Sequence, residues 1–258
     1  MWKLVAGTLL VFLTGSNAFA SPSQEEREIE ARAVEVVREM CTLLSETKSF
    51  AVKADEIYDE LLDVGLKIQF SNRRTVAVQR PNQAVADVEG DAGHFSLWYN
   101  KDTVSAFDKR HNAYTVFGVP DELDAALDFM ASEYDTAMPL ADLVRTDCHD
   151  VLTGNALFGM YVGIHEVDGV RSHHVAFAND WLEWQIWIDA ENDPLPRKIV
   201  INYKNEPGEP QYTAVLRSWN LNPDLPEGLF RFEPPDGATR MEAKNFRRPF
   251  GRGAEEEK

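Results

Sequence analysis

The sequence predicts an α+β fold in which helices interrupt an antiparallel β-sheet. Short segments of alternating apolar and polar residues recur about every ten residues, with turn residues between them, which is typical of a meandering antiparallel sheet. Apolar residues repeat at helical spacing in residues 24–46 and again in residues 120–134. The second of these segments lies between two groups of strands. We therefore expect one helix before the sheet and a helical insert within it.

The composition indicates a globular and acidic protein. Of 258 residues, 44% are hydrophobic and 27% are charged, which argues against a disordered or fibrous chain. The formal net charge of −17 argues against binding to nucleic acid, because neutralising phosphates requires a clustered basic surface. No segment after the N-terminus has an apolar run long enough to span a bilayer.

Residues 1–20 have the pattern of a secretory signal peptide. Lys3 supplies the positive charge, Leu4 to Leu13 form a short apolar run, and Ala18 and Ala20 are placed as in a cleavage signal. The alternative is an N-terminal membrane anchor, but the run has about half the length that a spanning helix needs. We expect cleavage after Ala20 and a soluble periplasmic protein.

The first elements after the signal peptide are predicted to be a helix and a long hairpin. The helix, over residues 24–46, has one apolar stripe made by Ile29, Ala33, Val36, Val37, Met40, Leu43 and Leu44. Alternating residues then begin at Ser49 and continue after a turn at 63–65. Asn72 and Arg74 interrupt the apolar face of the second arm, so we expect a bulge or an opening there.

The rest of the chain alternates between strands and the insert. Strands are predicted at 84–89, 94–100, 103–108, 111–117, 183–189, 197–204 and 211–221, and helices at 120–134, 139–144 and 147–152. Another strand begins near Met160, and Asp168-Gly169 is a hairpin turn that places Ile164 opposite His173. Residues 230–235 form a final extended piece. Residues 241–258 are expected to be a disordered tail, which leaves 21–240 as a single domain.

Several phrases of the sequence resemble a family of uncharacterised predicted periplasmic bacterial proteins. They read SFAVKADEIYDELLDVGLKIQFS, MPLADLV, VDGVRSHHVAF, EWQIWID, LPRKIVINYK, PQYTAVLRSWNL and FRFEPPDGA. That family is similar in turn to the periplasmic lipoprotein carriers. The resemblance implies a curved antiparallel sheet forming an incomplete barrel, with helices as a lid over an apolar space that holds acyl chains. It carries no catalytic motif, and a shared fold does not settle function.

The two cysteines, Cys41 and Cys148, allow two interpretations. An exported protein meets an oxidising compartment, where the two thiols can pair. Alternatively, each is a separate buried thiol that packs as a small hydrophobe. Both interpretations suit Cys41, which lies on or beside the apolar face of the first helix.

The sequence contains no recognisable catalytic or metal-binding motif. His173 and His174 are adjacent on a strand and point to opposite faces, so they are poorly placed to share an ion. The segment at His165 starts like a zinc-protease motif but lacks the second histidine. A Gly-x-Ser-x-Gly elbow, a phosphate loop and a dinucleotide fingerprint are also absent from the sequence. We therefore expect no cofactor, no metal and no enzymatic activity.

The apolar residues of the sheet suggest either a filled core or a ligand cavity. Trp184 and Ile186 share one face of a strand, and Trp187 lies on the other face. Aromatic residues on both faces indicate that both faces are covered or that one lines a cavity. The candidate cavity residues are Phe50, Val52, Leu66, Ile68, Phe70, Leu123, Leu127, Met130, Trp184 and Ile186.

Three functions compete on these observations. The first is a soluble periplasmic module that binds a lipid, an acyl chain or a lipidated protein in an apolar cavity. The second is an interaction or scaffold protein of the cell envelope with a filled interior. The third is an enzyme with an unfamiliar site in which His173 meets Glu166 or Arg171 across the hairpin. The sequence specifies neither the ligand nor the oligomeric state.

Overall fold

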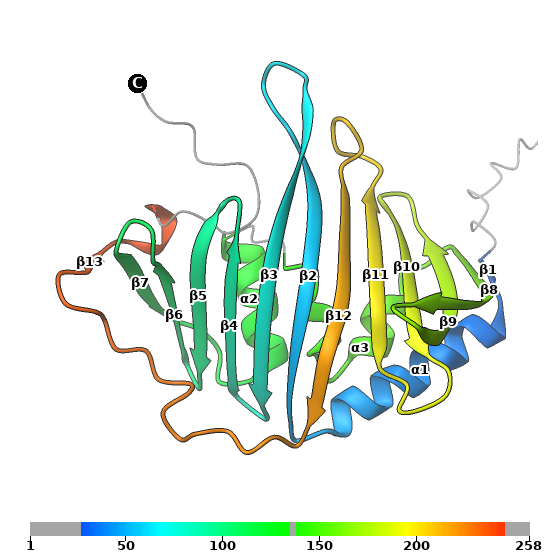
Figure 1. Ribbon diagram of the computed structural model, residues 1–258, viewed down its shortest axis with the longest axis horizontal. Helices are drawn as coiled ribbons and strands as arrows, with labels where there is room; N and C mark the ends of the chain where they lie inside the picture. Colours follow the sequence, from blue (N-terminus) through cyan, green and yellow to red (C-terminus); the bar gives the residue numbers. More distant parts are fainter. Residues whose placement is uncertain (1–26, 135–137, 246–258) are drawn as a thin grey trace, which may run out of the picture.

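One continuous sheet dominates the computed structural model, which describes residues 27–134 and 138–245 (Figure 1). Its thirteen strands are, in spatial order, β1 (Glu28–Ile29), β8 (Phe158–Val167), β9 (Val170–Ala178), β10 (Leu182–Asp189), β11 (Pro196–Tyr203), β12 (Gln211–Leu221), β2 (Ser49–Leu61), β3 (Lys67–Gln79), β4 (Gln83–Gly90), β5 (Gly93–Asn100), β6 (Thr103–Asp108), β7 (Ala113–Gly118) and β13 (Thr239–Arg240). Only the short outer strands β1 and β13 pair in parallel. The edges do not meet, so the prediction of an incomplete antiparallel barrel is confirmed.

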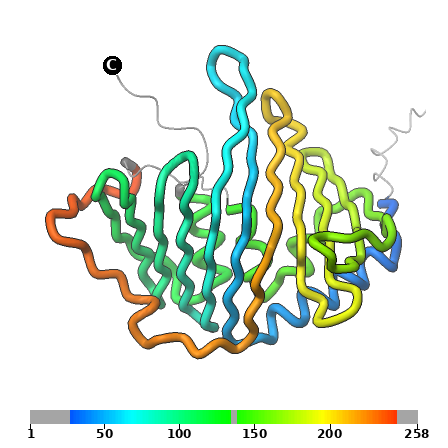
Figure 2. Tube along the Cα trace, in the orientation of Figure 1, coloured from blue at the N-terminus to red at the C-terminus, as the bar shows by residue number. Residues whose placement is uncertain are grey.

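The helices lie together on one face of the sheet, which we call the inner face (Figures 1 and 2). They are α1 (Ala31–Glu46), α2 (Leu123–Tyr134), α3 (Cys148–Thr153) and the short 3₁₀ helices η1 (Ala141–Leu143) and η2 (Ala243–Asn245). Helix α1 packs closely on β8, β9 and β10, whereas α2 approaches no strand as closely.

The first helix begins later than the predicted residue 24. Residues 24–26 lie outside the described part of the chain, and Glu28–Ile29 form β1, which pairs with Phe158–Gly159 of β8. The Arg27 guanidinium also donates a hydrogen bond of 2.9 Å to the Ala156 carbonyl. Residues 27–29 make these contacts with distant residues in place of another helical turn, because short isolated helical segments are only marginally stable.

The long hairpin predicted after the first helix is confirmed and stands in the middle of the sheet. β2 and β3 have 13 residues each and pair without interruption from Ser49–Gln79 to Leu61–Lys67. The bulge expected at Asn72 and Arg74 is wrong, because the register does not shift there. Their side chains are buried on the inner face instead.

A buried ion pair explains why the charged residue Arg74 is tolerated on the apolar inner face of β3. Arg74 Nε lies 2.5 Å from Oε1 of Glu56 on the neighbouring strand β2, and the Tyr212 hydroxyl of β12 donates a 2.7 Å hydrogen bond to the same oxygen. Glu56 is 1% exposed. The partner charge and the hydroxyl offset the desolvation of the carboxylate, which lets the hairpin keep a regular register. Burial and the nearby Glu56 raise the pKa of Tyr212 well above its ordinary value.

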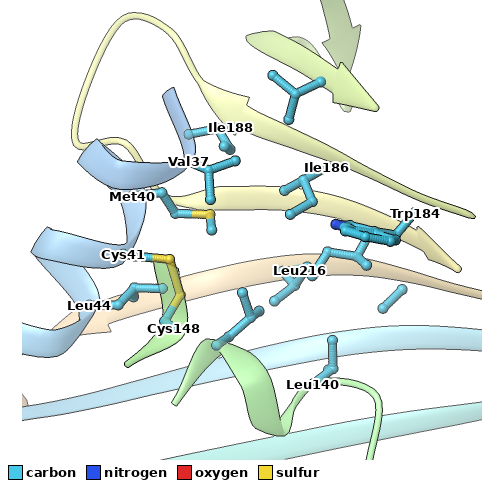
Figure 3. Close-up of a cluster of buried hydrophobic side chains, with 14 of the residues drawn as sticks. Val37, Met40, Cys41, Leu44, Leu140, Cys148, Trp184, Ile186, Ile188 and Leu216 are labelled. Carbon is cyan, nitrogen blue, oxygen red and sulfur yellow. A yellow bond between two sulfur atoms is a disulfide. The ribbon is translucent and has the colours of Figure 1, made fainter. Parts of the chain in front are cut away.

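Two apolar clusters cover the inner face, and Val76, Trp219 and Leu221 pack against both of them. In the first cluster, Val37, Met40 and Leu44 of α1 pack against Trp184, Ile186, Ile188 and Leu216 of the sheet (Figure 3). The second cluster joins α2 to the other half of the sheet. Its buried members are Phe50, Val78, Tyr99, Val104, Val119, Leu123, Ala126, Leu127 and Met130.

Two connections attach the helical insert to the first cluster. Cys41 of α1 and Cys148 of α3 form a disulfide (Figure 3). Arg80, just after β3, donates hydrogen bonds to the Leu44 carbonyl at 3.2 Å and to the Val144 carbonyl at 2.7 Å. The C-terminal end of the insert is therefore held against α1 and the sheet.

The remaining sequence predictions have mixed outcomes. The hairpin turn at Asp168-Gly169 is confirmed, with Ile164 opposite His173. Residues 230–235 form no strand, and Phe232 instead packs on Trp98 of the outer face with ring centroids 4.9 Å apart.

The expected signal peptide lies outside the described residues. So does the expected disordered tail apart from 241–245, where η2 forms. No helix in the described ranges is long and apolar enough to cross a membrane.

The buried ion pair makes a prediction about stability. Arg74→Met removes the cation that faces Glu56, so we expect the free energy of unfolding to fall by about 3–5 kcal/mol. Glu56→Leu combined with Arg74→Met removes both charges and is expected to recover most of that loss. Urea unfolding of the three proteins measures both effects. A double variant that is less stable than Arg74→Met contradicts this account of the pair.

Candidate functional site

An apolar cavity of about 170 Å³ lies on the inner face, between the insert and β3–β7. It is only partly enclosed. The wall formed by the sheet includes Val76, Val78, Ala84, Ala86, Val88, Phe95, Leu97, Tyr99, Val104, Ala106 and Phe117. The insert contributes Leu123, Leu127, Met130, Met138, Leu140, Ala141 and Val144.

The alternation of the strands explains why this wall is apolar. Successive side chains of a strand point to opposite faces, so every second residue of β4, β5 and β6 faces the insert. On β4 these are Ala84, Ala86 and Val88, whereas Asp87 on the other face bonds to His94, Ser96 and Lys109. The small residues at 84 and 86 leave space that larger side chains would fill.

Arg74 is the one charged residue in the described lining of the cavity. Its guanidinium is already paired with the Glu56 carboxylate, so this end of the wall carries a neutral pair and not an isolated charge. Tyr99 is also neutral at physiological pH, since burial and the nearby Asp121 raise its pKa to about 12. The electrostatics of the wall therefore favour an uncharged, apolar occupant.

Only part of the predicted cavity lining surrounds this space. Leu123, Leu127 and Met130 line it, as the helical spacing of the insert implied. Phe50 is buried in the same apolar cluster without lining the space. Helix α2 therefore covers the half of the sheet that follows the long hairpin, not the half that contains Trp184.

The other predicted lining residues lie elsewhere. Val52, Trp184 and Ile186 are buried in the first cluster, under α1, and Phe70 packs against that cluster. Leu66 is 58% exposed and Ile68 is partly exposed, because the β2–β3 hairpin extends beyond the rest of the sheet (Figure 1). The half of the inner face beneath α1 is therefore packed with side chains.

The sequence did not predict most of the residues that line the cavity. The sequence does predict β4–β7 as strands, and their alternation marks the inward positions. What spacing cannot indicate is which half of a sheet a helix will cover. A short helix was predicted at 139–144, where the structure has η1, but the contribution of this segment to the cavity was not predicted.

Polar contacts tie α2 to the segment that follows it. Arg145 is buried and donates to Asp128 of α2 and to Asp147 before α3, each at 2.6 Å. The backbone nitrogen of Thr146 donates to Asp124, also on α2. These paired carboxylates raise the pKa of Arg145, and the guanidinium in turn lowers that of Asp147. Helix α2 and the segment before α3 are thus held as one unit.

Of the residues of the enzyme hypothesis, Glu166 lies opposite Arg171 on the β8–β9 hairpin, whereas His173 lies opposite Ile164. His173 Nδ1 lies 2.8 Å from the Tyr161 hydroxyl, near α1. Arg171 pairs with Glu191, and both side chains are exposed. His174 faces the opposite side of the sheet, where its ring stacks on Trp187. Within residues 27–134 and 138–245, no group of three or more His, Cys, Asp and Glu is arranged to hold a metal.

The two neighbouring histidines predict how stability depends on pH. Burial, followed by Arg32, lowers the pKa of His173, and burial lowers that of His174, to which His165 and Lys198 also contribute. As the pH falls below about 6.5, the unfolded chain binds protons at these sites before the folded chain does. The free energy of unfolding is therefore expected to fall between about pH 7.5 and about pH 5. Urea unfolding across this range tests the prediction, and His173→Gln and His174→Gln should each flatten the slope. Unchanged slopes in both variants contradict it.

Comparison with solved structures finds proteins of similar size but low identity. An uncharacterised conserved protein from Thermus thermophilus is 8% identical, with a TM-score of 0.49, over 82% of this chain and 99% of that one. LprF from Mycobacterium bovis is 14% identical, with a TM-score of 0.48, over 78% and 98%. The LolA superfamily protein NE2245 from Nitrosomonas europaea is 10% identical, with a TM-score of 0.40, over 78% and 97%.

No curated protein matches the chain. A family model does, over residues 33–243, which include α2, α3, η1, most of α1 and every described strand except β1. The protein therefore belongs to the family described as "Predicted periplasmic protein (DUF2092)".

Proposed function

We propose that this protein is a non-enzymatic periplasmic binding module whose inner-face cavity holds an acyl chain of a lipid or of a lipidated protein. The observation that carries the proposal is the apolar cavity between α2 and β3–β7, whose one charged lining residue, Arg74, is already paired with Glu56. The other polar residues of the lining are Ser96, Tyr99 and Thr115, and a wall that is otherwise apolar can shelter apolar surface from water.

The size of the cavity limits what it holds without movement. A dry cavity of about 150 Å³ in another protein accommodates benzene, and pockets for drug-sized ligands measure about 300–1,000 Å³. The present 170 Å³ therefore fits about six carbon atoms of a chain. Each further buried methylene contributes about 0.8 kcal/mol, so displacement of the helical cover for a longer chain is compensated by burial.

The part of the cover that has to move is α2, because Leu140 and Leu143 at η1 are buried in the first cluster together with α1. Helix α3 is fixed to α1 by the Cys41–Cys148 disulfide, and α1 packs closely on the sheet. Helix α2 lies farther from the strands and is held to the segment after it by Arg145. The Arg80 hydrogen bond to the Val144 carbonyl is the contact that ties this segment to the end of β3.

A scaffold role in the cell envelope is the second candidate, and one observation favours it. The tip of the β2–β3 hairpin projects from the molecule and carries exposed apolar side chains, with Val64 83% and Leu66 58% exposed (Figure 1). Apolar side chains that cluster on a surface often mark an interaction site. Native mass spectrometry of protein purified without detergent separates the two candidates. Co-purified lipid supports the binding module, and a stoichiometric protein partner without lipid supports the scaffold.

Filling the cavity is expected to abolish binding of an apolar probe. In Ala86→Leu, three added carbon atoms project into the space between β4 and α2. We expect the affinity for the fluorescent probe 1-N-phenylnaphthylamine, measured by titration, to fall at least tenfold. Stability should not fall by more than about 1–3 kcal/mol, the usual range for overpacking.

The matched control is the same substitution on the outer face. Ala51 is a half-buried residue of β2 whose neighbours Phe50 and Val52 point inward. Ala51→Leu should leave probe binding unchanged. Equal binding by Ala86→Leu and the wild-type protein, with no co-purified lipid in either, rejects the cavity as the binding site.

Loosening the cover is expected to have the opposite effect. Arg80→Ala removes the hydrogen bonds to Leu44 and Val144, so α2 should open more readily. Hydrogen exchange should become faster in residues 123–134 but not in 36–41, where the disulfide and the first cluster hold α1. Arg110→Ala, in the exposed turn after β6, is the control. Faster exchange in both segments would mean that Arg80 stabilises the whole fold and does not act as a specific latch.

A further inference from the structure

Two histidines meet on the outer face of the sheet, at a distance from the apolar cavity. His165 of β8 and His174 of β9 lie on neighbouring antiparallel strands, and their Nδ1 atoms are 2.9 Å apart. His165 is exposed whereas His174 is buried, so solvent reaches the contact from the side of His165. We propose that the two Nδ1 atoms form a chelating site for a divalent transition-metal ion, with Cu²⁺ as the best fit.

The surroundings of His174 fix which of its nitrogen atoms can bind a metal. Its Nε2 lies 3.0 Å from the side-chain oxygen of Gln185. An amide oxygen only accepts hydrogen bonds, so Nε2 carries the proton and Nδ1 presents a lone pair. Metal-binding histidines commonly donate their other ring N–H to such an acceptor, which orients the ring. Gln185 therefore prepares His174 as a ligand before any ion arrives.

His165 can provide the second lone pair without a change of charge. In the absence of metal, its Nδ1–H donates to His174 Nδ1. When an ion binds, this proton leaves Nδ1 and solvent returns one to Nε2, so the ring stays neutral. Both Nδ1 atoms then face the ion.

The two nitrogen atoms are close enough for one ion to reach both. Metal–nitrogen bonds to histidine measure about 2.0–2.1 Å, so two ligands at a right angle are about 2.9 Å apart and two tetrahedral ligands about 3.3 Å. The observed 2.9 Å is the length of the hydrogen bond between the free rings, and a small rotation of the exposed His165 ring directs both nitrogen atoms to one ion in either geometry. Square-planar or tetragonal coordination by nitrogen is typical of Cu²⁺ and Ni²⁺, and Cu²⁺ binds more tightly in the Irving–Williams order. Water completes the coordination at the exposed side.

One neighbouring side chain disfavours binding of the ion, and another allows binding to be detected by fluorescence. The Lys198 ammonium lies 4.6 Å from the centre of the Trp187 ring, and its charge disfavours a cation nearby. The net charge of −17 acts in the other direction. The ring of His174 stacks on Trp187 with centroids 3.9 Å apart, so a bound Cu²⁺ is close enough to quench this tryptophan.

Titration of the purified full-length protein with Cu²⁺ tests the proposal. We expect saturable quenching of tryptophan fluorescence with one equivalent, and an electron paramagnetic resonance spectrum with nitrogen couplings. His165→Asn and His174→Asn should each weaken binding at least tenfold. Trp187→Phe should remove most of the quenching and keep the nitrogen couplings. Far-ultraviolet circular dichroism checks that each variant is folded, and His165 is the more informative site because it is exposed.

The control is a histidine outside the pair. His94 of β5 lies 2.9 Å from Asp87, on the half of the sheet far from β9, and is the competing surface ligand. His94→Asn should bind Cu²⁺ as the wild-type protein does. Wild-type affinity in folded His165→Asn, or loss of binding only in His94→Asn, overturns the proposal. Because the cavity is not involved, Ala86→Leu should bind Cu²⁺ normally, so this test is independent of the proposed function.

Discussion

The buried contact between Glu56 and Arg74 is the constraint around which the inner face is organised. It sits on the two central strands, and the Tyr212 hydroxyl from a third strand completes it. A charged pair at this position requires partners in a fixed register, because an unpaired buried charge is strongly destabilising. The apolar surface around it forms two clusters, one with α1 and one with α2, and Val76, Trp219 and Leu221 pack against both.

The two halves on either side of the pair differ in how completely they are filled. Under α1, long side chains such as Met40 and Trp184 interdigitate, and the Cys41–Cys148 disulfide fixes the helical layer (Figure 3). Under α2, alanines at 84, 86 and 106 leave a space. A rigid half beside a loosely covered half allows one part of the inner face to open while the rest of the sheet keeps its shape.

Local chemistry explains which parts of the fold the sequence predicted. Turn residues and alternation are encoded within a few positions, so the hairpin at Asp168-Gly169 and its register were predicted to the residue. Glu56 is 18 positions from Arg74 and 156 positions from Tyr212, so alternation alone could only register Arg74 as an interruption. The pair of His165 and His174 lies diagonally across the hairpin whose register was predicted, and it was missed because only the adjacent His173 and His174 were considered as a pair. The choice of which half α2 covers depends on packing across the whole sheet.

An open space in a folded core has a cost that the rest of the molecule has to offset. At about 24 cal/mol per Å³, an empty cavity of 170 Å³ destabilises the fold by about 4 kcal/mol. The disulfide closes a segment of 107 residues, which in the chain-entropy model contributes about 4–5 kcal/mol. These magnitudes are similar, so the covalent link between α1 and α3 offsets a cost of the size that the unfilled space imposes. An unfilled half beside a covalently fixed half is the arrangement on which the proposed binding of an apolar chain depends.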